Sequence, residues 1–331
     1  MEIVRAHADE FDAIVDLFRA YDFALKERAW FDWKHLQNPF GAPHLFKLVQ
    51  DGELAGTVGL LAQPFRHDGR ELTAVQAVDG LMGRAIRGKG LFNDVMFFVM
   101  GTVPDGVAGP RFGTGFASLP GSMKALENAG WRRLANFRVR KALLSARALR
   151  RLPGGALLWR LLVPVWGLMR ARLFAGAASD LAVVEVSRFD EDLDRFQPAG
   201  RVAGGRSAAF LNWRVLDNPR DQMRAFTFRL DGRLVGYAIC KVRPATWEVV
   251  EFRTELPGRG AAAAFLKHLH ARRLVDSVDF WLLDGFLQED HLPRGLLERG
   301  TAGAMFVHGI EWAGLPADPR AWAASYLDSD W

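Results

Sequence analysis

The segment Asp32–Pro39 reads DWKHLQNP, and the segment Asn212–Pro219, which begins 180 residues further along the chain, reads NWRVLDNP. A second pair has the same separation, because DGELAG at Asp51–Gly56 returns as DGRLVG at Asp231–Gly236. Two matches with one separation and no gap between them indicate an internal repeat. The chain of 331 residues is also long enough for two domains of ordinary size.

Further matches extend the repeat in both directions along the chain. The matching pairs are Phe11–Phe18 with Phe189–Phe196, Gly88–Gly90 with Gly258–Gly260, Gly115–Phe116 with Gly285–Phe286, and Gly130 with Gly300. Because order and spacing persist throughout, we expect two copies of one domain. The predicted division is a first domain over 1–140, a linker over 141–179 and a second domain over 180–331.

Each copy has the same predicted elements, read from hydrophobic periodicity and turn signals. The first copy should contain a helix over 11–18, strands 44–50, 54–61 and 73–82, a helix over 91–100, a strand ending at Phe116, a short helix closing at Gly130 and a final strand. The second copy should contain a helix over 189–196, strands 224–230, 234–242 and 247–253, a helix over 261–274, a strand ending at Phe286, a short helix closing at Gly300 and a final strand. Strands mixed with helices in this order predict an α/β fold class.

The composition excludes several classes of protein. Half of the residues are hydrophobic and 24% are charged, which is enough apolar material to bury a core. Cys240 is the single cysteine, so the chain has no internal disulfide and no cysteine-rich zinc site, and we expect no metal. No uncharged apolar run approaches the ~20 residues that cross a bilayer, and residues 1–10 lack the apolar core of a signal peptide. We therefore expect a cytoplasmic protein.

The net charge of +5 is concentrated in one part of the chain. Residues 131–179 contain no Asp or Glu, and within them residues 156–174 interleave apolar side chains with Arg160, Arg170 and Arg172. One interpretation is a linker helix packed between the two domains. The other is a basic amphipathic helix that lies peripherally on the anionic inner face of a membrane.

The segment Arg87–Phe92, which reads RGKGLF, lies between a predicted strand and a predicted helix. At such a junction successive backbone N–H groups and the positive end of the helix dipole face one space. Gly88 and Gly90 let the backbone approach an anion closely, while Arg87 and Lys89 add positive charge. The segment is therefore a candidate diphosphate site, although a Gly-Lys-Gly turn in a surface loop would read the same way.

In this context the chain resembles the GNAT superfamily of N-acetyltransferases, whose members carry Arg/Gln-x-x-Gly-x-Gly/Ala between this strand and helix. Arg87 and Gly90 match that motif, whereas Phe92 replaces the usual small sixth residue. The resemblance covers both copies and implies two domains, each with a mixed, mostly antiparallel sheet flanked by helices. The tandem layout is similar to GNAT proteins of cell-surface polysaccharide biosynthesis.

The resemblance also implies a co-substrate, acetyl-CoA or another acyl-CoA, and an amine acceptor such as a small molecule or an amino sugar. Its pantetheine arm would lie in a V-shaped gap between the fourth and fifth strands. The implied coenzyme-binding residues are Val78, Gly80, Leu81, Met82, Arg87, Gly88, Lys89, Gly90, Leu91, Phe92 and Ser118.

The acid and base of the reaction are less easily placed. Asp79, within an apolar strand, is a candidate base, with an ion pair to Arg84 or Arg87 as the structural alternative. The family's usual acid is a tyrosine after the fifth strand, but no tyrosine lies between residues 112 and 130. Ser122 is the remaining catalytic candidate there, and both it and Ser118 are alternatively helix-cap or turn residues.

Several other residues have structural alternatives. Pro257 replaces the arginine of the loop in the second copy and removes an N–H donor, which predicts a degenerate coenzyme site. Glu251 is the best-placed carboxylate of that copy and is interpreted as a solvated or paired strand residue. His35 is either part of an acceptor cleft or structural, and Trp33 and Trp213 are expected to be packing residues.

The favoured function is N-acyl transfer from acyl-CoA to an amine. A non-catalytic coenzyme A-binding or scaffold protein is the first alternative, because the family's tyrosine is missing. The second is an aminoacyl-tRNA-dependent ligase of the peptidoglycan-bridge type, which the basic segment would suit. Nucleic acid is otherwise not an expected partner.

Overall fold

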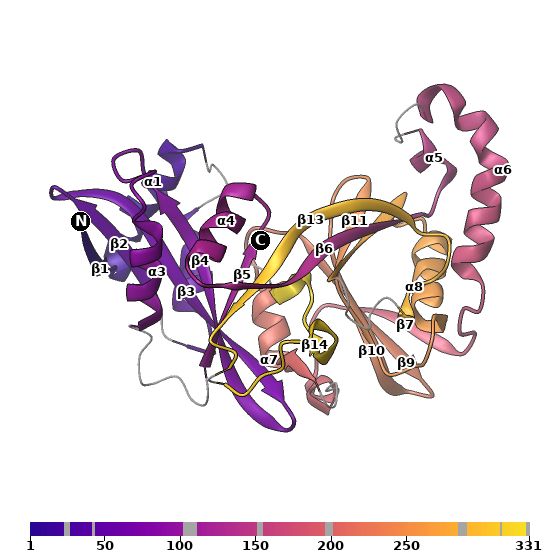
Figure 1. Ribbon diagram of the computed structural model, residues 1–331. Helices are drawn as coiled ribbons and strands as arrows, with labels where there is room; N and C mark the ends of the chain where they lie inside the picture. Colours follow the sequence, from indigo (N-terminus) through magenta and orange to yellow (C-terminus); the bar gives the residue numbers. More distant parts are fainter. Residues whose placement is uncertain are drawn as a thin grey trace.

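The computed structural model describes residues 1–22, 27–41, 44–101, 111–150, 155–195, 201–283, 290–311 and 313–328. Of residues 111, 155–159 and 195 it describes the backbone only. Within these ranges the strands form one large, mostly antiparallel sheet that runs through both copies and is flanked by helices (Figure 1). The predicted α/β fold class is therefore confirmed.

The first copy and the linker hold the following elements. They are β1 (Glu2–Arg5), α1 (Phe11–Ala20), α2 (Arg28–Phe31), the π-helical turn η2 (Asp32–Leu36), β2 (His44–Gln50), β3 (Glu53–His67), β4 (Arg70–Met82), α3 (Phe92–Gly101), β5 (Arg111–Ala117), α4 (Pro120–Asn128), β6 (Arg132–Leu143), α5 (Ala146–Leu149) and α6 (Gly155–Phe174). The predicted strand 44–50 and the short helix before Gly130 both form.

The second copy repeats this order after the linker. Its elements are β7 (Leu181–Val186), η3 (Glu191–Arg195), β8 (Val202–Gly204), α7 (Ala208–Leu211), the π-helical turn η4 (Asn212–Leu216), β9 (Met223–Leu230), β10 (Arg233–Lys241), β11 (Thr246–Thr254), α8 (Gly260–Ala271), β12 (Ser277–Leu283), β13 (Leu297–His308), η6 (Pro319–Ala321), β14 (Trp322–Ala323) and η7 (Tyr326–Asp328). Residues 285 and 286 of the repeat lie outside the described part.

The two Asp-Gly turns form the predicted hairpins. Asp51 and Gly52 have φ values of 54° and 83°, and Asp231 and Gly232 have 51° and 79°. Two consecutive residues with positive φ are what a tight hairpin turn with the right-handed twist of its strands requires, and Asp-Gly tolerates them. The hairpins β2–β3 and β9–β10 follow from this local chemistry.

The last strand of each copy is exchanged with the other copy. In the middle of the sheet the order is β5-β13-β6-β12, so β13 pairs antiparallel with β5 of the first copy, and β6 pairs antiparallel with β12 of the second. In Figure 1 both strands cross between the halves side by side. The exchange makes one continuous sheet.

The prediction of a helix that closes at Gly300 is wrong. Gly300 lies inside β13, where the register against β6 shifts between Glu298 and Thr301 and again before Gly303. Because Leu297, Glu298 and Thr301 on both sides of Gly300 pair with β6, the ladder holds this segment extended in spite of its glycines.

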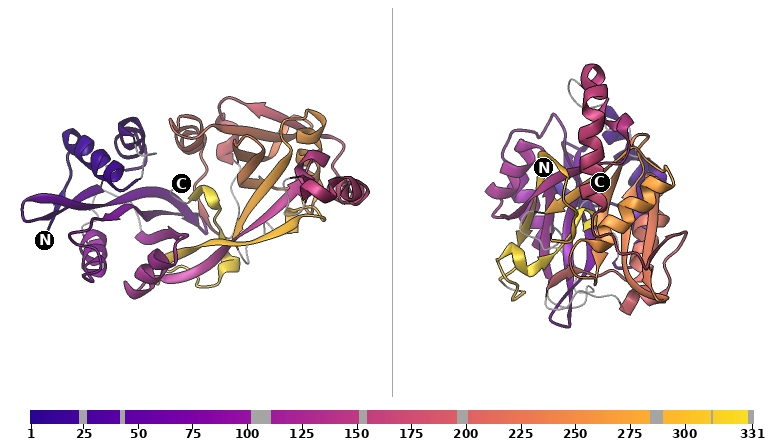
Figure 2. Two further views of the ribbon diagram at one scale, coloured as in Figure 1. Left: turned by 90° about the horizontal axis from the view of Figure 1, so that it is seen from above. Right: turned by 90° about the vertical axis from the view of Figure 1, so that its right-hand side faces the viewer.

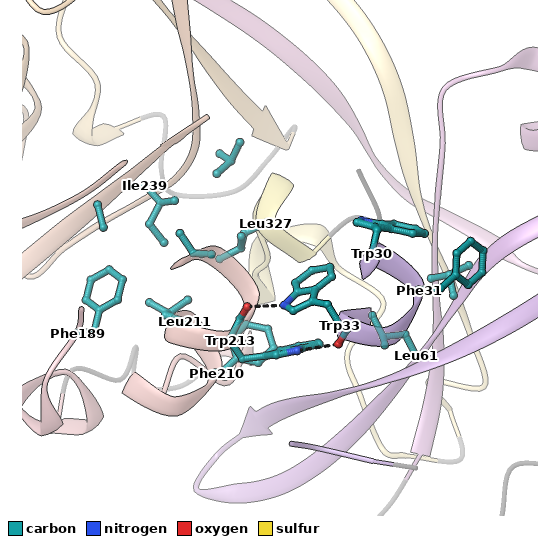
Figure 3. Packing of buried hydrophobic residues seen from close by; sticks show 14 of the residues in the cluster. Trp30, Phe31, Trp33, Leu61, Phe189, Phe210, Leu211, Trp213, Ile239 and Leu327 are labelled. Atoms are coloured by element: carbon teal, nitrogen blue, oxygen red, sulfur yellow. Dashed lines mark hydrogen bonds between the residues drawn. The ribbon is translucent and has the colours of Figure 1, made fainter. Parts of the chain in front are cut away.

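A pair of equivalent tryptophans joins the two copies at their centre. The indole Nε1 of Trp33 donates to the carbonyl of Trp213 at 2.9 Å, and the indole of Trp213 donates to the carbonyl of Trp33 at 3.2 Å. Their rings stack with centroids 5.3 Å apart, as Figure 3 shows. Both side chains are buried in a hydrophobic cluster drawn from both copies, so the expectation of packing residues is confirmed. The reciprocal contacts indicate a local two-fold relation between the copies.

The linker helix α6 does not lie between the two halves. In Figures 1 and 2 it stands at the outer edge of the second copy, beside α8 and far from β1. The interpretation of residues 156–174 as a helix packed between the domains is therefore wrong. None of the helices in the described ranges combines the length and apolar character that crossing a bilayer requires.

Candidate functional site

The strands β4 and β5 separate before they end. Their parallel pairing runs from Thr73 opposite Arg111 to Gln76 opposite Thr114, yet β4 continues to Met82 and β5 to Ala117. The carboxyl end of β4, which carries the predicted residues Val78 to Met82, is thus no longer hydrogen-bonded to β5. This divergence is the V-shaped arrangement that the family resemblance implies.

A β-bulge lies in the diverging part of β4. Gly59 of β3 pairs with Val78 and Thr57 pairs with Leu81, so that Asp79 and Gly80 together face one residue of β3. Asp79 has a φ of 50°, in the left-handed region that a non-glycine residue rarely adopts. A bulge bends its strand and redirects the adjacent backbone groups. In β4 the bulge lies in the part of the strand that is no longer hydrogen-bonded to β5.

The carboxylate of Asp79 is held by two basic side chains of η2. Its Oδ2 lies 2.8 Å from Lys34 Nζ and 2.9 Å from His35 Nε2, and all three side chains are fully buried. The carboxylate is therefore paired, as in the structural alternative, but its partners come from the Trp33 segment and not from Arg84 or Arg87. The buried His35 ring stacks on Phe31 with centroids 5.6 Å apart, in agreement with the structural interpretation of this histidine.

The loop after β4 has the geometry of an anion cradle. Gly88 and Gly90 have φ values of 79° and 76°, and a Cβ at either position would meet no atom within 4 Å. Residues 87–90 are exposed, and α3 starts at Phe92. Among the hydrogen bonds between described residues, none uses the N–H groups of residues 88–90. Open glycines, unused donors and the charges of Arg87 and Lys89 fit a diphosphate.

Tyr21 supports the base of this loop and was not predicted. Its hydroxyl accepts a hydrogen bond from the N–H of Arg84 at 2.6 Å, and the Arg87 guanidinium carbon lies 5.6 Å from its ring centroid. Arg87 Nε also donates to the carbonyl of Met82 at 3.0 Å. No sequence pattern links Tyr21, at the end of α1, with a loop more than sixty residues away.

The two predicted serines follow β5 at the same edge of the sheet, since β4 and β5 are parallel. Ser118 is the first residue after β5, and Ser122 is on the first turn of α4; both are exposed. The N-cap of α4 is Leu119, which makes no side-chain cap, so neither serine is the N-cap. Asn93 Nδ2 of α3 donates to the carbonyl of Asn128 at 3.3 Å, which joins α4 to the helix that follows the loop.

The end of the linker lies against Gly260 in the equivalent loop of the second copy. The N–H of Ala178 donates to the carbonyl of Gly260 at 3.2 Å, and His291 Nδ1 lies 3.1 Å from the carbonyl of Gly258. A Cβ at Gly260 would lie 3.2 Å from the carbonyl oxygen of Gly176. The end of the linker therefore occupies the space beside Gly260, whereas Gly258 stays exposed with open space at its Cβ position.

Strands β11 and β12 also separate, after Val249 opposite Phe280. There the C-terminal segment packs against both strands, and its Ser325 hydroxyl donates to Glu251. Glu251 is the counterpart of Asp79, because each lies three residues before the strand residue that faces the repeated glycines 56 and 236.

Glu251 is buried and fully paired. Arg206 Nη2 lies 3.0 Å from it and 2.7 Å from Asp328, and Arg253 also bonds to it. Burial alone raises the pKa of Glu251, but the Arg206 and Arg253 guanidinium groups outweigh it and hold that pKa at about 2. Of the two interpretations of Glu251, paired or solvated, the structure has the paired one.

Comparison with solved structures places this architecture among known folds. A conserved protein from Enterococcus faecalis V583, described as a probable N-acyltransferase, is 12% identical with a TM-score of 0.61, over 92% of this chain and 71% of that chain. A GCN5-related N-acetyltransferase from Anabaena variabilis ATCC 29413 is 11% identical with a TM-score of 0.62, over 92% and 72%.

A tandem GNAT protein from the clavulanic acid biosynthesis pathway is 14% identical with a TM-score of 0.53, and the match covers 99% of both chains. No family model and no curated protein sequence matches. At these identities the matches show the fold, which is that of tandem GNAT proteins.

Proposed function

We propose that the protein is an N-acyltransferase that moves an acetyl or other acyl group from acyl-CoA to an amine of a small molecule or sugar. The observation that carries the proposal is the open glycine loop, with unused N–H donors and flanking cations, at the end of the strand that leaves its neighbour. Only the first copy of the described chain has this combination. The fold of the solved relatives supports it.

The proposed coenzyme contacts follow the order of the chain. The diphosphate would accept hydrogen bonds from the N–H groups of residues 88–92 and ion pairs from Arg87 and Lys89. The pantetheine arm would lie along Val78, Gly80, Leu81 and Met82, where β4 has no strand partner, and would pass Ser118 at the end of β5.

In the proposed reaction the amine nitrogen forms a bond to the thioester carbonyl carbon, the carbon–sulfur bond breaks, and the ammonium proton must leave. We propose Asp79 as the group that finally receives this proton through water, with Lys34 and His35 fixing the direction of its carboxylate. Ser122 is proposed to donate a hydrogen bond to the departing thiolate. General acid and base groups of this kind contribute about 10²–10⁴-fold.

We further propose that the second copy binds no coenzyme. Pro257 removes one N–H donor, the end of the linker lies against Gly260, and the C-terminal segment packs where β11 and β12 separate. The division into units 1–140, 141–179 and 180–331 stays a proposal about the repeat, because β6 and β13 cross between the units.

The basic segment does not favour a tRNA partner. Four basic residues of this segment, all on β6, contact carboxylates. The pairs are Arg132 with Glu311 at 3.7 Å, Arg133 with Glu127 at 2.9 Å, Arg138 with Glu298 at 3.5 Å and Lys141 with Asp279 at 3.1 Å. These charges are already balanced, which reduces the field available to a phosphate backbone. A non-catalytic coenzyme-binding protein remains the alternative, since no tyrosine lies between residues 112 and 130.

Calorimetric titration with acetyl-CoA and longer acyl-CoAs, followed by thiol release with a panel of amines and amino sugars, tests the proposal. Binding with amine-dependent thiol release supports the transferase. Binding with no thiol release for any amine favours the non-catalytic alternative, and no binding of any acyl-CoA refutes both.

A further inference from the structure

Helix α6 presents an apolar stripe that no described residue covers. Leu161, Val165 and Leu168 are 75%, 51% and 58% exposed. Their spacing of four and three residues puts them on one side of the helix, with the exposed Pro164 between them. Large apolar side chains gathered on one exposed face mark an interaction surface more often than isolated ones do.

The opposite side of α6 is fixed to the protein. Trp166 Nε1 donates to the carbonyl of Leu143 at 3.0 Å, and its ring packs with Leu149 in a small cluster at the end of β6. Leu173, near the end of the helix, is fully buried in the core of the second copy. The helix therefore cannot rotate to bury its outer stripe.

The charges beside the stripe have one sign. Arg160 and Arg172 are exposed on the same helix, whereas the Arg170 guanidinium lies over the Trp166 ring, 4.8 Å from its centroid, and so is on the side that is fixed to the protein. Residues 131–179 contain no acidic residue at all. Within its own segment the apolar stripe is thus accompanied by two exposed arginines and no acidic side chain, a combination that favours anionic lipid surfaces.

We propose that α6 is a docking surface for an anionic lipid bilayer, on which it lies parallel to the plane of the membrane. Its position at the outer edge of the molecule leaves a flat surface free to approach it, as both views in Figure 2 show. A second copy of the chain is the other possible occupant. Two-fold pairing through α6 would bring arginine against arginine, which opposes that interface.

Co-sedimentation with vesicles tests the proposal independently of the transferase activity. The full chain is mixed with vesicles of phosphatidylcholine, and with vesicles of phosphatidylcholine and phosphatidylglycerol in equal parts. We expect binding to the second kind only, with loss at high salt because the arginines are screened. Arg172→Gln should weaken that binding about fivefold, the usual effect of one basic residue near an anionic surface.

A matched pair of variants separates the stripe from general hydrophobicity. Leu161→Ser with Leu168→Ser should reduce vesicle binding at least tenfold, whereas Val4→Ser, which removes an exposed apolar side chain from β1 at the other end of the molecule, should not change it. Unchanged acetyl-CoA affinity and thermal unfolding show that the variants are folded. Equal binding to both vesicle types, or equal loss in both variants, overturns the proposal. A dimer in sedimentation velocity that Leu161→Ser disrupts would also overturn it, because a second copy then covers the stripe.

Discussion

The substitutions Gly88→Ala and Gly258→Ala form a matched pair that separates coenzyme binding from stability. The two glycines are equivalent in the repeat, have φ values of 79° and 69°, and would each place a Cβ in open space. Their direct cost to folding should therefore be the same, roughly 1–2 kcal/mol for an alanine held at positive φ. Only Gly88 lies in the loop proposed to hold a diphosphate.

The expected loss of affinity follows from the hydrogen bonds at stake. If the alanine disturbs one bond between a backbone N–H and a charged phosphate oxygen, the loss is about 1.5–3 kcal/mol, which corresponds to at least roughly tenfold in Kd. Gly88→Ala should show this loss in a calorimetric titration with acetyl-CoA, while Gly258→Ala should stay within about twofold of the unchanged chain.

Thermal unfolding of both variants provides the control, because the two should be destabilised by similar amounts. Substitutions at Gly90 and Gly260 would be less well matched, since a side chain at Gly260 would press on the carbonyl of Gly176 while one at Gly90 would meet open space. Full acetyl-CoA affinity in Gly88→Ala would refute the cradle, and a loss confined to Gly258→Ala would assign the coenzyme to the second copy.

Three further predictions concern buried groups. Trp33→Ala should lower the free energy of unfolding by about 3–5 kcal/mol, because it leaves a cavity at the centre of the cluster between the copies and removes the ring that stacks on Trp213. Denaturant titration measures this change. A loss below about 1 kcal/mol would show that the pair is not central to stability. Asp79→Asn tolerates the same positive φ but removes the carboxylate that the buried Lys34 contacts, so it should lower the melting temperature in either case. If the carboxylate is the base, kcat should also fall about 10²-fold or more with little change in acetyl-CoA affinity, whereas an unchanged kcat in the folded variant would show a purely structural role. Arg206 and Arg253 depress the pKa of Glu251 to about 2. The contribution of this carboxylate to stability is therefore complete above the unfolded pKa of roughly 4.3 and is lost as the pH falls through the folded value. The difference in the free energy of unfolding between wild type and Glu251→Gln, measured by urea unfolding, should narrow from pH 7 toward pH 3, and a constant difference would contradict the ion-pair explanation.

Local signals in the sequence were sufficient for much of the fold. The two hairpins could be predicted because the turn requires two consecutive residues with positive φ, and the dipeptide Asp-Gly is typical of such a turn. The repeat then supplied the order of the remaining elements. The prediction at Gly300 failed because a glycine that ends a helix in one copy lies in the other within a strand held by distant neighbours.

The candidate site also has a part that could be predicted from the sequence and a part that could not. The glycine loop could be predicted from a short segment, since backbone conformation and the helix start are local properties. The partners of Asp79 could not, because Lys34 and His35 are on a turn 45 and 44 residues earlier that the packing of the two copies brings against β4. Ion pairs between distant elements carry no periodicity, and Tyr21 under the loop is another such case.

The exchange of β6 and β13 has a consequence for how the chain is made. When the first copy leaves the ribosome, the hydrogen-bonding edge of β5 has no partner, because β13 is synthesised almost two hundred residues later. An unpaired edge pairs readily with strands of other chains during that interval. Neither copy can complete its sheet alone, so we expect the nascent first half to need protection and the finished molecule to unfold as one cooperative unit.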